Sequence, residues 1–96
     1  MIKLEKTDEY QEWFTSLSDK IVKAHIQARI DRLRAGNAGD VEPVGEGVSE
    51  LKLYFGSGWR VYYCEHNGEI IILLAGGNKR TQKRDIKLAL MLARNL

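Results

Sequence analysis

Hydrophobic and polar positions follow two different periods near the start of this 96-residue chain. Residues 2–6 alternate apolar and charged side chains, which is the period-2 pattern of a half-buried strand. Thr7 then offers a helix cap, and the two residues after it place carboxylates in a first helical turn. Large apolar groups recur at i, i+3, i+4 and i+7, and they are Tyr10, Trp13, Phe14 and Leu17. The pattern predicts a strand followed by a short amphipathic helix.

A second and longer helical stripe follows. Its apolar side chains are Val22, Ile26, Ile30 and Leu33. Gly36 is the expected terminator of this helix. The glycines and the proline between residues 36 and 48 then predict a connector, which is too short for a domain boundary. We therefore expect one domain over residues 1–96.

Three strand-like runs follow the connector, at residues 49–55, 59–65 and 69–75. They are separated by Gly56-Ser57-Gly58 and His66-Asn67-Gly68, which are typical of hairpin loops. Residues 80–94 resume a helical pattern with a basic first turn. The predicted order is β-α-α-β-β-β-α, an α+β fold of two layers. We expect the helices on one face of a mostly antiparallel sheet and the other face open to solvent or a partner.

The first hairpin loop assigns side chains to these two faces. A three-residue loop at 56–58 pairs Phe55 with Trp59 and Lys52 with Tyr62. Side chains of equal parity then share a face. The buried face is expected to hold Leu51, Leu53, Phe55, Trp59, Val61 and Tyr63. The open face is expected to hold Lys52, Tyr54, Arg60, Tyr62 and Cys64.

A cluster of cations follows the last predicted strand. A two-residue Asn67-Gly68 turn places Arg60 opposite Ala75, which brings the next basic segment toward Arg60. That segment contains Lys79, Arg80, Lys83 and Arg84. Guanidinium and ammonium groups bind phosphates, and flat rings stack on unpaired bases, so cations beside tyrosines suit RNA. The same cations also fit an ordinary solvated strand and helix face, and the pattern leaves both interpretations open.

Composition adds a charge asymmetry and excludes several classes of site. The formal net charge is +2, but residues 1–50 hold 7 basic and 10 acidic residues, whereas residues 51–96 hold 8 and 3. This asymmetry favours a polyanion contact in the second half. The single cysteine excludes an internal disulfide, and the two histidines have no ligand spacing, so no metal or cofactor is expected. Without a long apolar run, we expect a cytoplasmic protein with no membrane contact.

Two sequence blocks resemble a known family. The first is ELKLYFGSGWRVYY at residues 50–63, and the second is LLAGGNK at 73–79, followed by QKRDI at 82–86. Together they resemble the HigB-like, phage-derived Gp49-like branch of the RelE/ParE toxin superfamily, over essentially the whole chain. The resemblance implies a microbial-RNase-like fold. It also implies the toxin of a type II toxin–antitoxin system, an endoribonuclease that cuts messenger RNA in the ribosomal A site and inhibits translation.

The resemblance further implies roles for particular residues. In the family, basic residues of a sheet strand, of the R-V-x-Y strand and of the segment after the last strand contact or activate the scissile phosphate. Arg60, Lys79 and Lys52 match these positions and are the expected catalytic residues. The expected RNA-binding residues are Lys52, Tyr54, Arg60, Tyr62, Lys79, Arg80, Lys83 and Arg84.

The general base is not assigned by this comparison, because the chain departs from the family in its C-terminal segment. Arg60 stays charged up to roughly pH 12, so it is expected to stabilise the phosphorane rather than to take a proton. Lys52 or Lys79 can act as a base only if neighbouring cations lower its pKa by several units. Asp85 is an alternative base if it faces the cations.

The resemblance also names partners and leaves two rival functions. The expected partners are a helix-turn-helix, HigA-like antitoxin, the ribosome and messenger RNA, with DNA bound only through the antitoxin. One rival is a non-enzymatic, ParE-like inhibitor of gyrase, which needs no catalytic groups. The other is a degenerate phage-derived binding module, for which Arg60→Ala leaves any growth phenotype unchanged.

Overall fold

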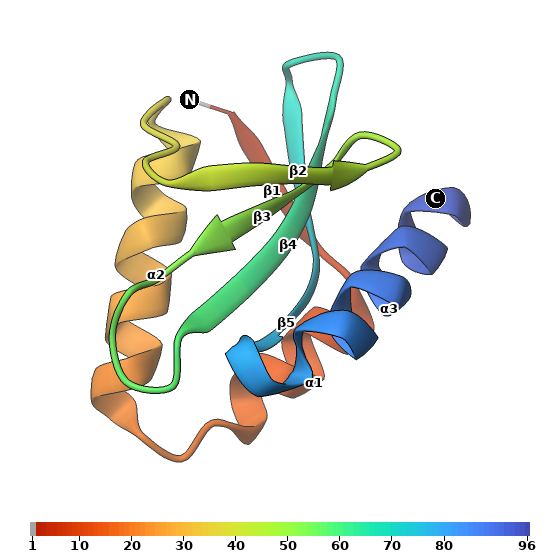
Figure 1. Ribbon diagram of the computed structural model, residues 1–96. Helices are drawn as coiled ribbons and strands as arrows, with labels where there is room; N and C mark the ends of the chain where they lie inside the picture. Colours follow the sequence, from red (N-terminus) through yellow and green to blue (C-terminus); the bar gives the residue numbers. More distant parts are fainter. Residues whose placement is uncertain (1) are drawn as a thin grey trace.

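The computed structural model describes residues 2–96 and has mixed α and β structure. Five strands form one sheet in the order β1-β5-β4-β3-β2, in which only β1 and β5 run parallel. The elements in chain order are β1 (Lys3–Lys6), α1 (Asp8–Ser16), α2 (Lys20–Arg34), β2 (Val41–Gly45), β3 (Val48–Lys52), β4 (Trp59–His66), β5 (Ile70–Asn78), the 3₁₀ turn η1 (Lys79–Thr81) and α3 (Gln82–Arg94). Figure 1 shows this arrangement. The predicted α+β class is confirmed.

The helix boundaries follow from local capping. The Thr7 hydroxyl accepts a hydrogen bond from the Tyr10 backbone N–H, and the Asp19 carboxylate caps the first turn of α2. Gly36, with φ +94°, ends α2, as the sequence predicted. Its left-handed conformation lets Asn37 N–H donate to the Arg32 carbonyl oxygen at 2.8 Å.

The predicted connector contains a strand that sequence analysis missed. β2 pairs antiparallel with β3 and forms one edge of the sheet. Proline lacks a backbone donor but is tolerated on an edge strand, where Pro43 lies opposite Ser49. Glu46 and Gly47 then turn the chain with positive φ angles of 52° and 81°. The segment that the glycines and the proline predicted as a connector therefore contains the first strand and the turn of the β2–β3 hairpin.

Helices cover both faces of the sheet, so the prediction of two layers with helices on one face is wrong. On one face, α1 and α2 pack against sheet residues such as Leu51, Val61 and Leu73. On the other face, Ala89 of α3 packs against Tyr62 and the alternate β3–β5 residues, including Val48, Cys64, Ile72 and Leu74. Figure 1 shows α2 and α3 on opposite sides of the sheet. Strands covered on both faces are apolar at consecutive positions, and residues 70–75 have this composition.

The β3–β4 hairpin has the predicted faces but not the predicted register. Lys52 pairs with Arg60, and the last ladder bond runs from Leu53 N–H to the Trp59 carbonyl oxygen. A turn in which Gly58 N–H donates to the Phe55 carbonyl oxygen closes the loop, so the strands end sooner than expected. The shift is two residues in total, which preserves parity. The predicted separation of the two sets of side chains therefore holds.

The β4–β5 hairpin turns at Asn67-Gly68, as predicted, and both residues have positive φ. His66 pairs with Ile70, one residue beyond the partner expected for a two-residue loop, and an irregularity between Tyr62 and Tyr63 shifts the register by one more residue. Arg60 therefore pairs with Gly77 instead of Ala75. The shift brings Arg60 closer along β5 to the basic segment that follows the strand.

Gly76 and Gly77 lie within strand β5 and not in a turn. They allow helices to pack closely on both faces of the strand. A Cβ on Gly76 would collide with the Trp13 ring of α1. A Cβ on Gly77 would collide with Asp85 Oδ2 of α3 and lie 2.7 Å from Thr81 Oγ1. The two glycines therefore let a helix approach the same strand from each side.

We expect Gly77→Ala to destabilise the fold by about 3 kcal/mol, because the added methyl group must displace the buried Asp85 carboxylate. Urea denaturation followed by tryptophan fluorescence measures the loss. Adding Asp85→Ala removes the atom that the methyl group meets, so the double variant should lose less than the sum of the single losses. Strictly additive losses would contradict this close contact.

Candidate functional site

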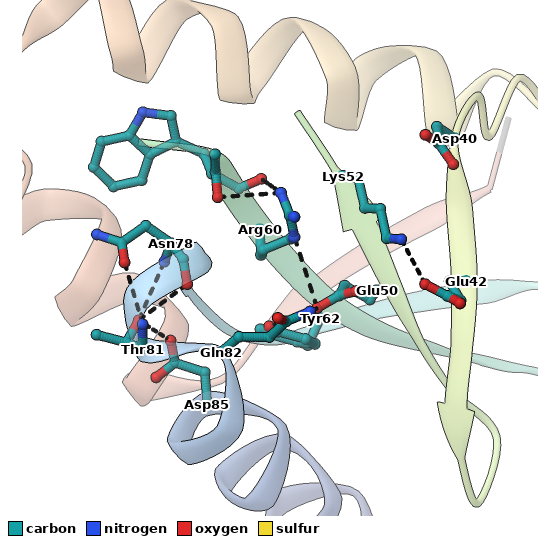
Figure 2. Close-up of polar contacts among 12 residues, drawn as sticks. Asp40, Glu42, Glu50, Lys52, Arg60, Tyr62, Asn78, Thr81, Gln82 and Asp85 are labelled. Carbon is teal, nitrogen blue, oxygen red and sulfur yellow. Dashed lines mark hydrogen bonds and ion pairs between the residues drawn. The ribbon is translucent and has the colours of Figure 1, made fainter. Parts of the chain in front are cut away.

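The centre of the candidate site is a buried carboxylate on β3. Glu50 is 1% exposed, and its Oε2 accepts hydrogen bonds from the Tyr62 hydroxyl at 2.9 Å and from Gln82 Nε2 at 2.8 Å. Arg60 Nε lies 3.8 Å from the same oxygen. Figure 2 shows these side chains converging from β3, β4 and the start of α3. Glu50 therefore joins the sheet to α3 and holds a negative charge beside Arg60.

Arg60 is held in place by its own strand. Its Nη1 donates to the Gly58 and Trp59 carbonyl oxygens, at 3.1 and 3.3 Å. Its Nε is buried, and within residues 2–96 it has no hydrogen-bond partner, so its interaction with Glu50 is a charge contact. The whole residue is 7% exposed. The predicted open position of Arg60 is therefore wrong, because the chain covers most of the guanidinium.

Lys52 lies next to Arg60 across the β3–β4 pair and forms an ion pair with an acidic residue of β2. Its Nζ is 2.5 Å from Glu42 Oε2 (Figure 2). The hydrogen bond to Glu42 raises the pKa of Lys52 above its ordinary value. A lysine acts as a base only when its pKa is lowered. The ion pair with Glu42 therefore favours the protonated form of Lys52, which is the opposite of what a general base requires.

The remaining predicted cations surround η1. Asn78 caps this turn by accepting hydrogen bonds from the Arg80 and Thr81 backbone N–H groups. The turn brings Lys79 close to Gly58 of the β3–β4 loop. A Cβ added at Gly58 would lie 3.4 Å from Lys79 Cβ and 3.5 Å from Arg60 Nη1, so this glycine lies between the two cationic residues. The side chains that remain exposed are Lys79, Arg80, Lys83 and Arg84. Lys52, Arg60 and Lys79 are thus brought to one end of the sheet, and we call them the cationic cluster.

Three residues considered in the sequence analysis lie in a different setting from the one expected: one predicted RNA-binding residue, one residue of the expected open face and the alternative base. Tyr62 is fully buried under α3, so its ring is not available for stacking, and burial together with Glu50 raises its pKa. Cys64 is also buried. Asp85 is 3% exposed, accepts a hydrogen bond from the Thr81 hydroxyl and faces Gly77. Its carboxylate is therefore held between Thr81 and Gly77 at the start of α3.

A protein-family model described as Phage derived protein Gp49-like matches residues 12–94. This chain belongs to the Gp49-like family. It is 44% identical over 95 residues to an uncharacterized protein of Haemophilus influenzae, with 99% of this chain and 96% of the relative covered. The predicted resemblance to the Gp49-like branch is confirmed.

Solved structures of E. coli RelE have a similar fold to the Gp49-like chain. RelE in the intact RelBE toxin–antitoxin complex matches with a TM-score of 0.67 at 15% identity, covering 81% of this chain and 96% of RelE. A RelE mutant in the free state matches with a TM-score of 0.68 at 12% identity, covering 90% and 95%. The isolated RelE toxin matches with a TM-score of 0.67 at 15% identity, covering all of both chains. The predicted RelE-like fold is therefore confirmed.

Sequence analysis missed three polar residues that organise the site of this Gp49-like chain. Gln82 donates a hydrogen bond to Glu50, and Glu50 lies beside Arg60 in the buried part of the site. Glu42 forms an ion pair with Lys52. A signal for Glu50 was present, because it has the same parity as Lys52 and therefore shares its face. Glu42 lies in the missed strand β2, so no pairing could place it.

The described part of the Gp49-like chain, residues 2–96, contains no group of three or more histidine, cysteine, aspartate or glutamate residues arranged to hold a metal ion. In the same residues, no helix has the length and apolar composition required to span a membrane.

Proposed function

We propose that this chain is the toxin of a type II toxin–antitoxin system and a ribosome-dependent endoribonuclease that cuts messenger RNA. The observation that carries the proposal is the cationic cluster, in which a guanidinium fixed by Glu50 and two carbonyl groups lies beside two lysines. Cations that are already held in place stabilise the negative charge that develops in a transition state better than mobile cations do, because they need no reorganisation during the reaction. The RelE-like fold supports this assignment.

The proposed chemistry is attack of an RNA 2′-hydroxyl, which loses its proton, on the adjacent phosphate. The bond from phosphorus to the 5′-oxygen breaks, the 5′-oxygen leaves as a protonated hydroxyl, and the upstream fragment ends in a 2′,3′-cyclic phosphate. Arg60 stabilises the charge of the phosphorane, and it cannot take up a proton because a guanidinium stays charged. Lys52, kept protonated by Glu42, and the exposed Lys79 bind the phosphates on either side. The catalytic groups of the chain are cationic, so we propose that the ribosome contributes to the acid–base chemistry and that cleavage depends on it.

The partners follow from the same proposal. A helix-turn-helix, HigA-like antitoxin suppresses the toxin, and the toxin approaches DNA only through that antitoxin. The toxin acts in the cytoplasm on ribosomes and messenger RNA. The exposed cations Arg80, Lys83 and Arg84 extend the cationic cluster along the start of α3 and provide further phosphate contacts.

Primer extension on messenger RNA from cells induced to express the chain tests the proposal. We expect new 5′ ends within translated regions at the onset of growth arrest, and none with Arg60→Ala. Growth arrest with intact messages would contradict the proposal. A gyrase supercoiling assay with the purified chain then identifies the ParE-like alternative, and coexpression with the neighbouring open reading frame tests the antitoxin.

A further inference from the structure

A cavity of about 480 Å³ opens beside the cationic cluster, between α2, the loop before β2 and the end of β3. This volume is in the range of sites that hold a small ligand. Its walls include His25, Arg32, Asn37, Asp40, Tyr54 and Phe55. Lys52 also lines it. Lys52 is also the partner of Arg60 across the β3–β4 pair, so this residue is shared by the cavity lining and the cationic cluster.

Arg29 fixes the floor of the cavity. Its guanidinium donates to the carbonyl oxygens of Ala38 at 2.8 Å, Lys52 at 3.0 Å and Asp40 at 3.2 Å. These bonds join α2 to the loop before β2 and to the end of β3. Gly39 leaves room for the guanidinium, since a Cβ there would lie 2.6 Å from Arg29 Nη1. The cavity is consequently preformed.

Aromatic rings form one side of the cavity. The His25 imidazole and the Phe55 ring are 4.4 Å apart between centroids, with an interplanar angle of 37°. The neighbouring Tyr54 side chain is 72% exposed. An exposed ring beside a packed aromatic pair is the kind of surface on which an unpaired base stacks.

The charged side chains of the cavity favour the binding of an anionic nucleic-acid strand. Arg32 is exposed and, among residues 2–96, forms no ion pair, while Lys52 pairs with Glu42 outside the cavity lining. Asp40 is the one acidic residue of the lining within these residues. It lies close enough to Tyr54 that a hydrogen bond raises the pKa of the phenol. Its carboxylate offers an acceptor for N–H groups of a base.

We propose that this cavity binds one unpaired base of the RNA strand whose scissile phosphate lies at Arg60, with Lys52 contacting the intervening backbone. The proposal rests on the proposed function and adds to it a base-binding subsite. A base stacked against Tyr54 and the His25–Phe55 pair would fix the position of the strand relative to the cationic cluster. The cavity therefore contributes affinity at one nucleotide position, whereas the cations act at phosphates of any sequence.

The test uses an uncleavable six-nucleotide 2′-O-methyl RNA and a series in which each nucleotide in turn is abasic. Fluorescence anisotropy with the full chain at one fixed salt concentration gives each dissociation constant. We expect one abasic position to weaken binding about tenfold, the effect of losing one stacked base. In His25→Ala or Tyr54→Ala, the abasic substitution at the same position should raise the dissociation constant by about twofold or less. His66→Ala, an exposed histidine in the β4–β5 turn, should retain the full tenfold penalty.

The outcomes separate the subsite from the function. If the 2′-O-methyl RNA binds and messenger RNA is cleaved on ribosomes, but no abasic penalty depends on His25 or Tyr54, the subsite is overturned and the endoribonuclease proposal stands. If no RNA binds and no message is cut, both are overturned. If His25→Ala and Arg32→Ala weaken binding of the antitoxin and leave every abasic penalty unchanged, the cavity docks protein and the RNA subsite is overturned.

Discussion

Arg60→Lys is expected to reduce the rate of ribosome-dependent messenger RNA cleavage about 10²–10³-fold, the range for loss of one preorganised donor to a developing oxyanion. Lysine keeps the positive charge but not the planar fork that reaches two carbonyl oxygens and Glu50 together. The measurement is a single-turnover assay with purified ribosomes programmed with a defined message. Substrate should still bind, because most phosphate affinity comes from the exposed cations.

The matched control is Arg94→Lys, at the far end of α3, where an exposed arginine pairs with Glu46. It should cleave at the rate of the unmodified chain. Circular dichroism establishes that both variants are folded. Equal cleavage rates for Arg60→Lys and the unmodified chain would show that Arg60 does not stabilise the transition state, and the catalytic assignment of the cationic cluster would fail.

The pattern of alternation predicted which side chains of β3 and β4 share a face, because parity survives a register shift of two residues. Lys52 pairs with Arg60 and not with Tyr62, yet Leu51, Val61 and Tyr63 still lie on one side. Register itself depends on the turn geometry, and a turn that closes from Phe55 to Gly58 is not distinguished by composition from a simple three-residue loop.

Burial of the candidate site could not be predicted, since it depends on where α3 docks. The apolar run at 70–75 is compatible with burial on both faces, but periodicity alone does not reveal which helix covers each face. Ala89 packs on the face that holds Tyr62, and Gln82 reaches Glu50 from the first position of α3. The cations that the sequence predicted on an exposed surface therefore form a partly covered site, in which Arg60 is buried and Lys79 is exposed.

The Gly76-Gly77 pair illustrates a packing requirement that the sequence alone does not reveal. Both glycines lie within β5, and the need for them arises from Trp13 on one face and Asp85 on the other. Such close approaches join residues that are distant in sequence. They become visible only when helices on both sides of the strand are placed.

Glu50→Ala is expected to destabilise the chain by about 3–5 kcal/mol, the cost of leaving a buried charge without its partner. Arg60 is 7% exposed, and Tyr62 and Gln82 would lose their acceptor at the same time. Since a domain of this size has roughly 5–15 kcal/mol of stability, the variant should approach unfolding at 37 °C. Urea denaturation monitored by tryptophan fluorescence gives the free energy of unfolding.

Two further variants separate loss of charge balance from loss of packing. Glu65→Ala replaces an exposed carboxylate on β4 and should change the free energy of unfolding by no more than about 0.5 kcal/mol. The double variant Glu50→Leu with Arg60→Leu removes both charges, so it should recover much of the stability that Glu50→Ala loses, although it cannot cleave RNA. If the double variant is no more stable than Glu50→Ala, the loss comes from packing, and Glu50 does not balance the charge of Arg60.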